Sequence, residues 1–205
     1  MNVDWRVKPE RQRLAQGGRP GPPTVPFVLS VGVTGHRADG LPENALSILQ
    51  SRIREALVLL SETGSALFDT ERDCFAEDPP RLRFVSPIAD GADQIFASAV
   101  LDLGGSIEAI VPSDGYREAL PDTAKPLYDE LIGKASQVRY RDHRESTSTA
   151  HMDASRLMLD SADHLIAVWD GKPARGYGGT ADVVQDAHDR GLPVSIVWPE
   201  GAFRD

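Results

Sequence analysis

From Phe27 onward, short apolar runs alternate with longer amphipathic stretches. The runs typical of buried strands are "FVLSVGVTG", which ends at Gly35, "RLRFVSP", "SIEAIVP", "HLIAVW" and "PVSIVW", and a weaker one covers residues 137–140. Helical periodicity predicts helices over about residues 42–62, 90–103, 126–135, 148–162 and 180–190, whereas residues 64–80 are predicted to form a loop. This order of elements limits the chain to repeated strand–helix–strand units.

Such units have right-handed crossovers, so their strands run parallel and helices cover both faces of the sheet. We therefore predict an α/β protein with a three-layer, Rossmann-like fold and a mostly parallel central sheet. The 205 residues are 40% hydrophobic, which is enough to form one sizeable core. Residues 27–205 are accordingly predicted to form a single domain.

Residues 1–26 lack this pattern and are rich in proline and arginine. Five basic residues against two acidic ones give the segment a net charge of +3. We predict a mobile N-terminal arm, because the segment has no apolar periodicity with which to pack. The alternative is an arm that binds a partner.

Overall charge and hydropathy exclude several classes of protein. The net charge of −9 argues against binding duplex nucleic acid, because affinity for the phosphate backbone comes mainly from clustered Lys and Arg. The longest apolar runs are far shorter than the ~20 residues that span a bilayer, so no membrane span is predicted. Cys74 is the sole cysteine and no signal-peptide pattern is present, which predicts a cytoplasmic protein without a disulfide.

Ligands of open parallel sheets bind at the carboxyl ends of the strands, so the residues after each strand are the candidates for a site. The first such loop is "TGHR". Gly35 allows a sharp turn and a close approach to a ligand, while His36 and Arg37 offer donors that suit a phosphate or a sugar. The alternative is that His36 caps a turn and Arg37 is a solvated surface charge.

The second loop is "SPIADGAD", which contains Ser86, Asp90, Gly91 and Asp93. A capping box explains both carboxylates, with Asp90 as the helix N-cap and Asp93 answering it. Two carboxylates three residues apart are also suited to hold a metal or a ribose hydroxyl. Ser86, Gly91 and the helix start could bind an anion, but the carboxylates oppose this, so a sugar or base edge fits better.

The third loop, "WDGKPARGYGGT", joins a strand to a helix. It begins with Asp170 and ends with Gly178, Gly179 and Thr180 at the helix N-terminus. Unpaired N–H groups and the helix dipole favour an anion there, and Thr180 can cap the helix or add a hydroxyl contact. We predict a phosphate cradle, with a plain glycine-rich turn as the alternative.

Several familiar signatures are missing from the sequence. G-x-G-x-x-G and the Walker pattern are absent, which disfavours NAD-dependent dehydrogenation and triphosphate hydrolysis. A G-x-S-x-G elbow is also absent. His143 and His151 flank a polar run that is predicted to be a solvated loop leading into a helix, and no pair has the spacing of a metal motif. We therefore predict neither a metal nor a cofactor.

Taken together, "VGVTGHR", "VSPIADGADQIFASAVLDLG", "AIVP" and "LIAVWDGKPARGYGGTADVVQDA" resemble the SLOG superfamily over most of residues 27–198. That superfamily includes the LOG phosphoribohydrolases, DprA, the YpsA family and nucleotide sensors, and the chain is most similar to small stand-alone bacterial YpsA-like proteins. The resemblance implies a nucleotide ligand and, from LOG, a homo-oligomer. By position it implies ligand-binding roles for Gly35, His36, Arg37, Asp90, Gly91, Asp93, Gly178, Gly179 and Thr180.

One position departs from the pattern. LOG enzymes carry P-G-G-x-G-T-x-x-E, and the final Glu acts on the ribose during N-glycosidic cleavage. Here Val183 occupies that position, and Asp182 is one residue short, which on a helix turns a side chain by about 100°. Nucleosidase chemistry is weakened, although a carboxylate could enter from Asp90, Asp93 or Asp170.

Three functions of different classes fit these motifs. The first is a sensor or binding protein for a nucleotide or phosphorylated nucleotide derivative. The second is a phosphoribohydrolase acting on a nucleoside 5′-monophosphate, in which Asp90 or Asp93 assists ribose chemistry and Arg37 holds the phosphate. The third is a partner-interaction domain whose basic arm recruits the partner and whose crevice is vestigial.

Overall fold

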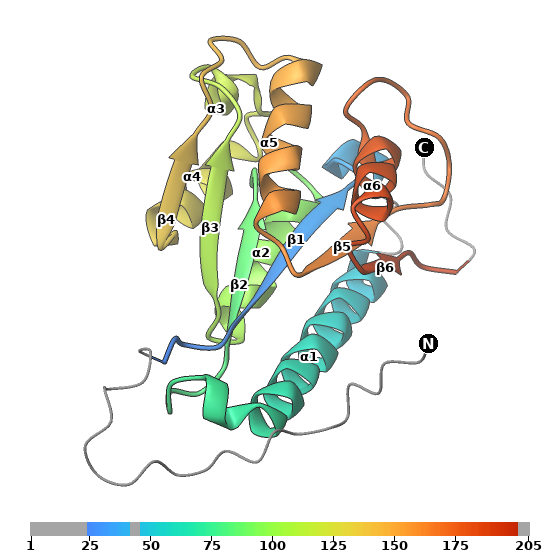
Figure 1. The fold of residues 1–205 in the computed structure, drawn as a ribbon. Helices are drawn as coiled ribbons and strands as arrows, with labels where there is room; N and C mark the ends of the chain where they lie inside the picture. The colour runs from blue at the N-terminus through green and yellow to red at the C-terminus, as the bar shows by residue number, and fades with distance from the viewer. Residues whose placement is uncertain (1–23, 42–45, 201–205) are drawn as a thin grey trace, which may run out of the picture.

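A computed structural model describes residues 24–41 and 46–200 (Figure 1). Its centre is a six-stranded sheet in the order β4-β3-β2-β1-β5-β6, and every neighbouring pair of strands is parallel. The strands are β1 Val28–Gly35, β2 Arg81–Ser86, β3 Ser106–Val111, β4 Gln137–Tyr140, β5 His164–Val168 and β6 Val194–Val197. The predicted α/β, Rossmann-like fold class is confirmed, and each strand lies where its apolar run predicts it.

Helices cover both faces of the sheet. On one face the core includes α1 Leu46–Thr70, α2 Ala92–Asp102 and α4 Lys125–Lys134. On the other face, nearer the viewer in Figure 1, α5 Ser148–Asp160 and α6 Thr180–Asp189 form a second core. Short helical turns are α3 Tyr116–Ala119, η1 Ala38–Gly40 and η3 Arg72–Cys74. No described helix is long and apolar enough to cross a membrane.

The strands are apolar at successive positions because both of their faces are covered. In β2, Phe84 packs into the core under α1 and α2, while its neighbour Val85 packs into the core under α5 and α6. Ile107 and Ile110 of β3 divide between the two cores in the same way. Continuous apolar runs, in place of strict alternation, are the expected signature of such a parallel sheet.

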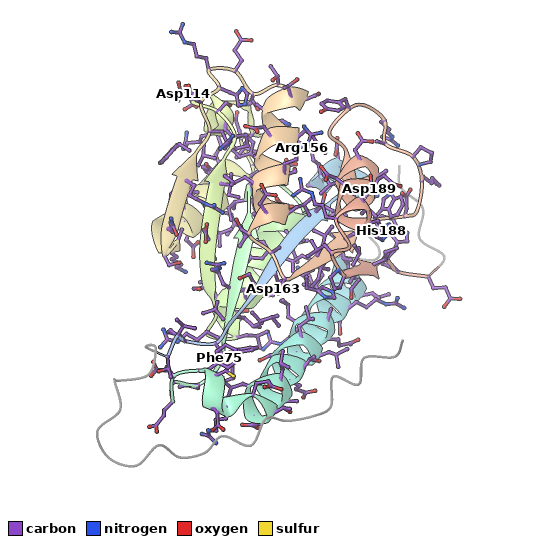
Figure 2. The ribbon with its side chains drawn as sticks, viewed as in Figure 1. Phe75, Asp114, Arg156, Asp163, His188 and Asp189 are labelled. Atoms are coloured by element: carbon purple, nitrogen blue, oxygen red, sulfur yellow. The ribbon has the colours of Figure 1, made fainter. Side chains whose placement is uncertain are left out.

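Helix α1 differs from its prediction. It continues through residues 64–70, which were predicted to be loop, and its expected first residues 42–45 lie outside the described part of the chain. Gly64 does not end the helix because it lies against Phe27, and the following turn buries Phe68, whose ring meets Phe27 edge-on with centroids 6.0 Å apart. Figure 2 shows Phe75 beside this end of α1.

Of the predicted arm, only residues 24–26 lie within the described part of the chain. Val25 forms a parallel bridge with Phe75, so these residues pack against the segment that follows α1. The rest of the arm lies outside the described residues.

A layer of charged side chains crosses the sheet near the C-terminal end of α5. Glu108 is buried, with Oε1 at 2.6 Å from Arg139 Nε and Oε2 at 3.4 Å from Arg83 Nη1. Arg83 also donates to Ser30 Oγ at 2.8 Å, and Arg139 donates to Ser161 Oγ at 2.8 Å. Both oxygens of this buried carboxylate are therefore paired within the fold.

Candidate functional site

A cleft of about 390 Å³ lies at the carboxyl ends of β1 and β5. These two strands are neighbours, yet the chain proceeds from β1 toward β4 on one side and from β5 to β6 on the other. The cleft thus occupies the point where the strand order reverses, which is where open α/β sheets bind ligands. Its volume lies within the ~300–1,000 Å³ typical of small-molecule sites.

The cleft brings together seven of the eleven residues that the sequence singled out. They come from the loop after β1, the first turn of α2 and the glycine-rich loop: Gly35, His36, Arg37, Asp93, Gly178, Gly179 and Thr180. Ser86, Asp90, Gly91 and Asp170 are not on its wall, but each supports a residue or loop that is.

His36 joins three elements beneath the cleft. Its N–H donates to Val168 at the end of β5, and its carbonyl accepts from Ala92 at the start of α2. The ring is buried, and Nε2 lies 3.3 Å from an oxygen of Asp170. His36 therefore locks the strand ends to the loop that follows β5 in addition to lining the cleft.

The prediction that Asp90 caps α2 and that Asp93 completes a capping box is wrong. Gly91, not Asp90, is the N-cap of α2, and no side chain caps that helix. Gly91 has φ +87°, and a Cβ there would lie 2.5 Å from the nitrogen of Ala38. Only glycine therefore lets the start of α2 approach the loop after β1 this closely. Asp90 turns away from the helix: it pairs with Arg37 Nη1 at 2.7 Å and accepts from the Ala38 N–H at 3.3 Å.

Asp93 is a buried carboxylate on the wall of the cleft, with a side chain of 6% exposure. Ser86 Oγ donates to its Oδ2 at 2.7 Å, and the Ala89 N–H donates to the same oxygen at 3.2 Å. Among the residues that the structure describes, none donates to Oδ1. Burial raises the pKa of Asp93 to about 6, so the group is ionised at neutral pH.

The glycine-rich loop is held in shape by its neighbours. Gly178 has φ +79°, and a Cβ there would lie 2.9 Å from the carbonyl oxygen of Ser148 in α5. Its N–H donates to Asp182 Oδ2 at 2.8 Å, so the acid near the expected catalytic position is engaged in holding the loop. Val183, at the position of the LOG glutamate, is buried in the core.

Thr180 does not cap α6, which corrects one of the two predicted roles for its hydroxyl. The N-cap is Gly179, and no side chain serves as a cap. Within the described residues, the N–H groups of Gly179, Thr180 and Ala181 have no acceptor. These three donors lie at the positive end of a helix dipole, in residues that line the cleft.

Basic side chains from the loop after β1 and from the glycine-rich loop line the cleft. Arg37, Lys172 and Arg175 all line the cleft. Lys172 Nζ lies 3.7 Å from Asp170 Oδ2, which places it over the same loop. The chain as a whole is acidic, but the glycine-rich loop brings two of these cations, Lys172 and Arg175, to the cleft.

Sequence reasoning missed the wall that faces Asp93. Tyr116 is buried, its ring meets that of His151 edge-on with centroids 5.7 Å apart, and Ser155 follows one turn later on α5. Burial raises the pKa of Tyr116 well above its ordinary value and lowers the pKa of His151. Tyr116 could have been found, because it follows β3 closely; His151 could not, because its flanking sequence is typical of a solvated loop.

The described residues contain no group of three or more His, Cys, Asp or Glu side chains that could hold a metal ion. The carboxylates near the cleft are instead paired with Arg37, Ser86 and backbone N–H groups. The cleft can bind an anion at the N-terminus of α6, and Asp93 can accept a hydrogen bond from a ligand.

The sequence matches no protein-family model and no curated protein. Among solved structures, DNA processing protein A (DprA) from Helicobacter pylori is similar, with a TM-score of 0.56 and 16% identity over 86% of this chain and 68% of that one. DprA from Streptococcus pneumoniae has a TM-score of 0.54 and 19% identity over 84% of this chain, which spans only 50% of that protein. TM1055 superposes less well, with a TM-score of 0.47 and 19% identity over 81% of this chain and 72% of that one. The chain therefore has a Rossmann-like fold of the type seen in DprA, as the SLOG-like motifs predict.

Proposed function

We propose that this chain binds a nucleotide or phosphorylated nucleotide derivative in the cleft, with a phosphate at the N-terminus of α6. The observation that carries the proposal is the set of three N–H groups, of Gly179, Thr180 and Ala181, that have no acceptor among the described residues and line the cleft. A phosphate accepts from several such donors at once, and the helix dipole favours its charge.

The surroundings of the three donors support a phosphate over a neutral ligand. Arg37, Lys172 and Arg175 line the same cleft and would offset the charge of the phosphate. The DprA of H. pylori is described as binding single-stranded DNA, which is itself built of phosphorylated nucleosides. In this chain, the formal charge of −9 favours a small ligand over a long polyanion.

A second candidate is the release of a base from a nucleoside 5′-monophosphate. Asp93 favours it, because the carboxylate lines the cleft and one of its oxygens has no donor within the described residues. The buried Val183 and the engaged Asp182 weigh against it. Chromatographic detection of free base after incubation with each monophosphate distinguishes this candidate from simple binding.

The proposal is tested by placing a carboxylate at Ala181, in the second position of α6. Ala181→Asp introduces a charge that suits a helix N-terminus but repels a phosphate, and Ala181→Asn has nearly the same size without the charge. A ligand at about 100 times its Kd adds roughly 2.7 kcal/mol, which raises the midpoint of thermal unfolding by about 5 to 11 °C.

We expect this shift in the wild type with at least one compound from a panel of nucleoside mono-, di- and triphosphates, NAD and ADP-ribose. The Asp variant is expected to lose it and the Asn variant to keep most of it. No shift with any compound, or an equal shift in the Asp variant, would contradict the proposed function.

A further inference from the structure

We infer that Asp93 binds a ribose hydroxyl, so that the cleft selects ribonucleotides over deoxyribonucleotides. This inference rests on the proposed phosphate site, because that site fixes the other end of the ligand. It concerns a different loop of the protein and a different part of the ligand.

Asp93 is held so that one oxygen serves the fold and the other faces a ligand. Ser86 and Ala89 both donate to Oδ2, at 2.7 and 3.2 Å, which fixes the plane of the carboxylate. Oδ1 receives no hydrogen bond from another described residue, although the side chain is more than nine-tenths buried and lines the cleft. Oδ1 is not enclosed by the fold, so a ligand or water in the cleft can reach it and supply the missing donor.

The charge of Asp93 decides which ligand group can supply that donor. An ionised carboxylate only accepts hydrogen bonds, so a hydroxyl fits and a phosphate is repelled. The charged and titratable groups around it are Arg37 and Asp90 from the neighbouring loops and Tyr116 from the α3 turn. Of these, Arg37 is already paired with Asp90, and Asp93 forms no ion pair with any of the described residues.

The spacing of the strands suits the sugar of a nucleotide. Asp93 follows β2, the phosphate-binding turn follows β5, and β1 lies between them. Two strand spacings separate the loops by about 10 Å. The ribose is bonded directly to the 5′-phosphate and lies nearer to it than the base edge does, so its hydroxyls are the donors placed to reach Oδ1.

The opposite wall is built for a neutral, hydroxyl-bearing group. Tyr116, His151 and Ser155 line it, and burial lowers the pKa of His151, which favours a neutral ring. Arg37 lies within electrostatic range of Tyr116 and His151, but its guanidinium is already paired with Asp90. The glycine-rich loop supplies Lys172 and Arg175, whereas this wall supplies a phenol, an imidazole and a hydroxyl, which suit the phosphate and the sugar of a nucleoside 5′-monophosphate.

The test measures the affinities of the four ribonucleoside 5′-monophosphates and of their 2′-deoxy and 3′-deoxy counterparts by calorimetry. A hydrogen bond to a charged group corresponds to roughly 10- to 100-fold in affinity. The wild type is expected to bind its best ribonucleotide at least about tenfold more tightly than one of the two deoxy forms. This comparison uses only the unaltered protein.

Asp93→Asn identifies the residue responsible. Its amide oxygen can take the place of Oδ2, so that an NH₂ donor replaces the Oδ1 acceptor with little change of shape. The variant should bind ribo and deoxy forms with affinities within about twofold of each other. Asp114→Asn removes an exposed carboxylate near the end of β3, labelled in Figure 2, and should retain the wild-type preference.

Two results would overturn the inference and leave the phosphate site standing: equal affinity of the wild type for ribonucleotides and both deoxy forms, or an unchanged preference in Asp93→Asn. A single-stranded oligodeoxynucleotide that binds more tightly than every ribonucleotide would also overturn it. Failure of every monophosphate to bind would overturn this inference, and failure of the whole panel of nucleotides would refute the proposed function with it.

Discussion

Two buried carboxylates, Glu108 and Asp93, differ in how much of their bonding capacity the fold uses. Glu108 lies in the sheet with one oxygen on Arg139 and the other on Arg83. Asp93 lies at the cleft with two donors on Oδ2 and none from the described residues on Oδ1. Burial of a charge is costly in both places, but the described residues pair both oxygens of Glu108 and only one oxygen of Asp93.

Polar groups at the two ends of α5 and α6 also differ in whether the fold supplies their hydrogen-bond partners. At the far end, Asp163 accepts the Ser30 N–H at 2.8 Å and ties β1 to the loop before β5 (Figure 2). At the cleft end, three N–H groups of the α6 terminus have no acceptor among the described residues. The paired groups at the far end hold the fold together, and the donors at the α6 terminus are available to a ligand.

The largest expected effect is at Glu108. Glu108→Gln removes the charge between two arginines and should lower the free energy of unfolding by about 3 kcal/mol, because the buried network loses its central partner. Urea denaturation measures the change. Glu130→Gln is the matched control, since Glu130 pairs with Lys134 in an exposed position and should cost little. Equal losses of stability from the two substitutions would show that the buried Glu108 pairs contribute no more than an exposed pair.

At Asp93, removal of the charge should stabilise the folded protein, and the gain should depend on pH. Its pKa is raised from 3.8 to about 6, so the folded chain binds this proton more tightly than the unfolded chain. The resulting stability is fully present below pH 4 and is lost as the pH rises through 6. Between pH 4 and 7, the stability of Asp93→Asn relative to wild type should therefore increase by about 2 kcal/mol.

Urea denaturation of both proteins at a series of pH values measures this difference. Asp114→Asn provides the baseline for loss of a carboxylate. A constant difference between Asp93→Asn and wild type across the range would mean that Asp93 is not held at an energetic cost.

The smallest expected effect separates two threonines at helix starts. Thr147 caps α5, because its Oγ1 accepts the Ala150 N–H at 3.2 Å, whereas Thr180 caps nothing. Thr147→Ala should cost about 1 kcal/mol and lower the thermal midpoint by roughly 2 to 4 °C. Thr180→Ala should change the midpoint by less than half as much. A larger loss from Thr180→Ala would show that its hydroxyl already serves the fold.

The sequence predicted the strands, most of the helices between them and the edge of the sheet that carries the cleft, because each depends on local pattern. It missed what depends on contacts between distant segments. Helix α1 runs past Gly64 because Phe27 packs there, and Asp90 leaves the helix cap because Arg37 lies opposite. His151 reaches the cleft only through the packing of α5 on Tyr116.

The most direct test of the phosphate site follows backbone amides by NMR during titration of ¹⁵N-labelled protein with adenosine 5′-monophosphate. We predict saturable downfield shifts of the Gly179, Thr180 and Ala181 amide protons, because each gains a phosphate acceptor. The Gly178 amide should shift far less, since it already donates to Asp182. Saturable shifts elsewhere on the protein, with none at these three amides, would contradict the account.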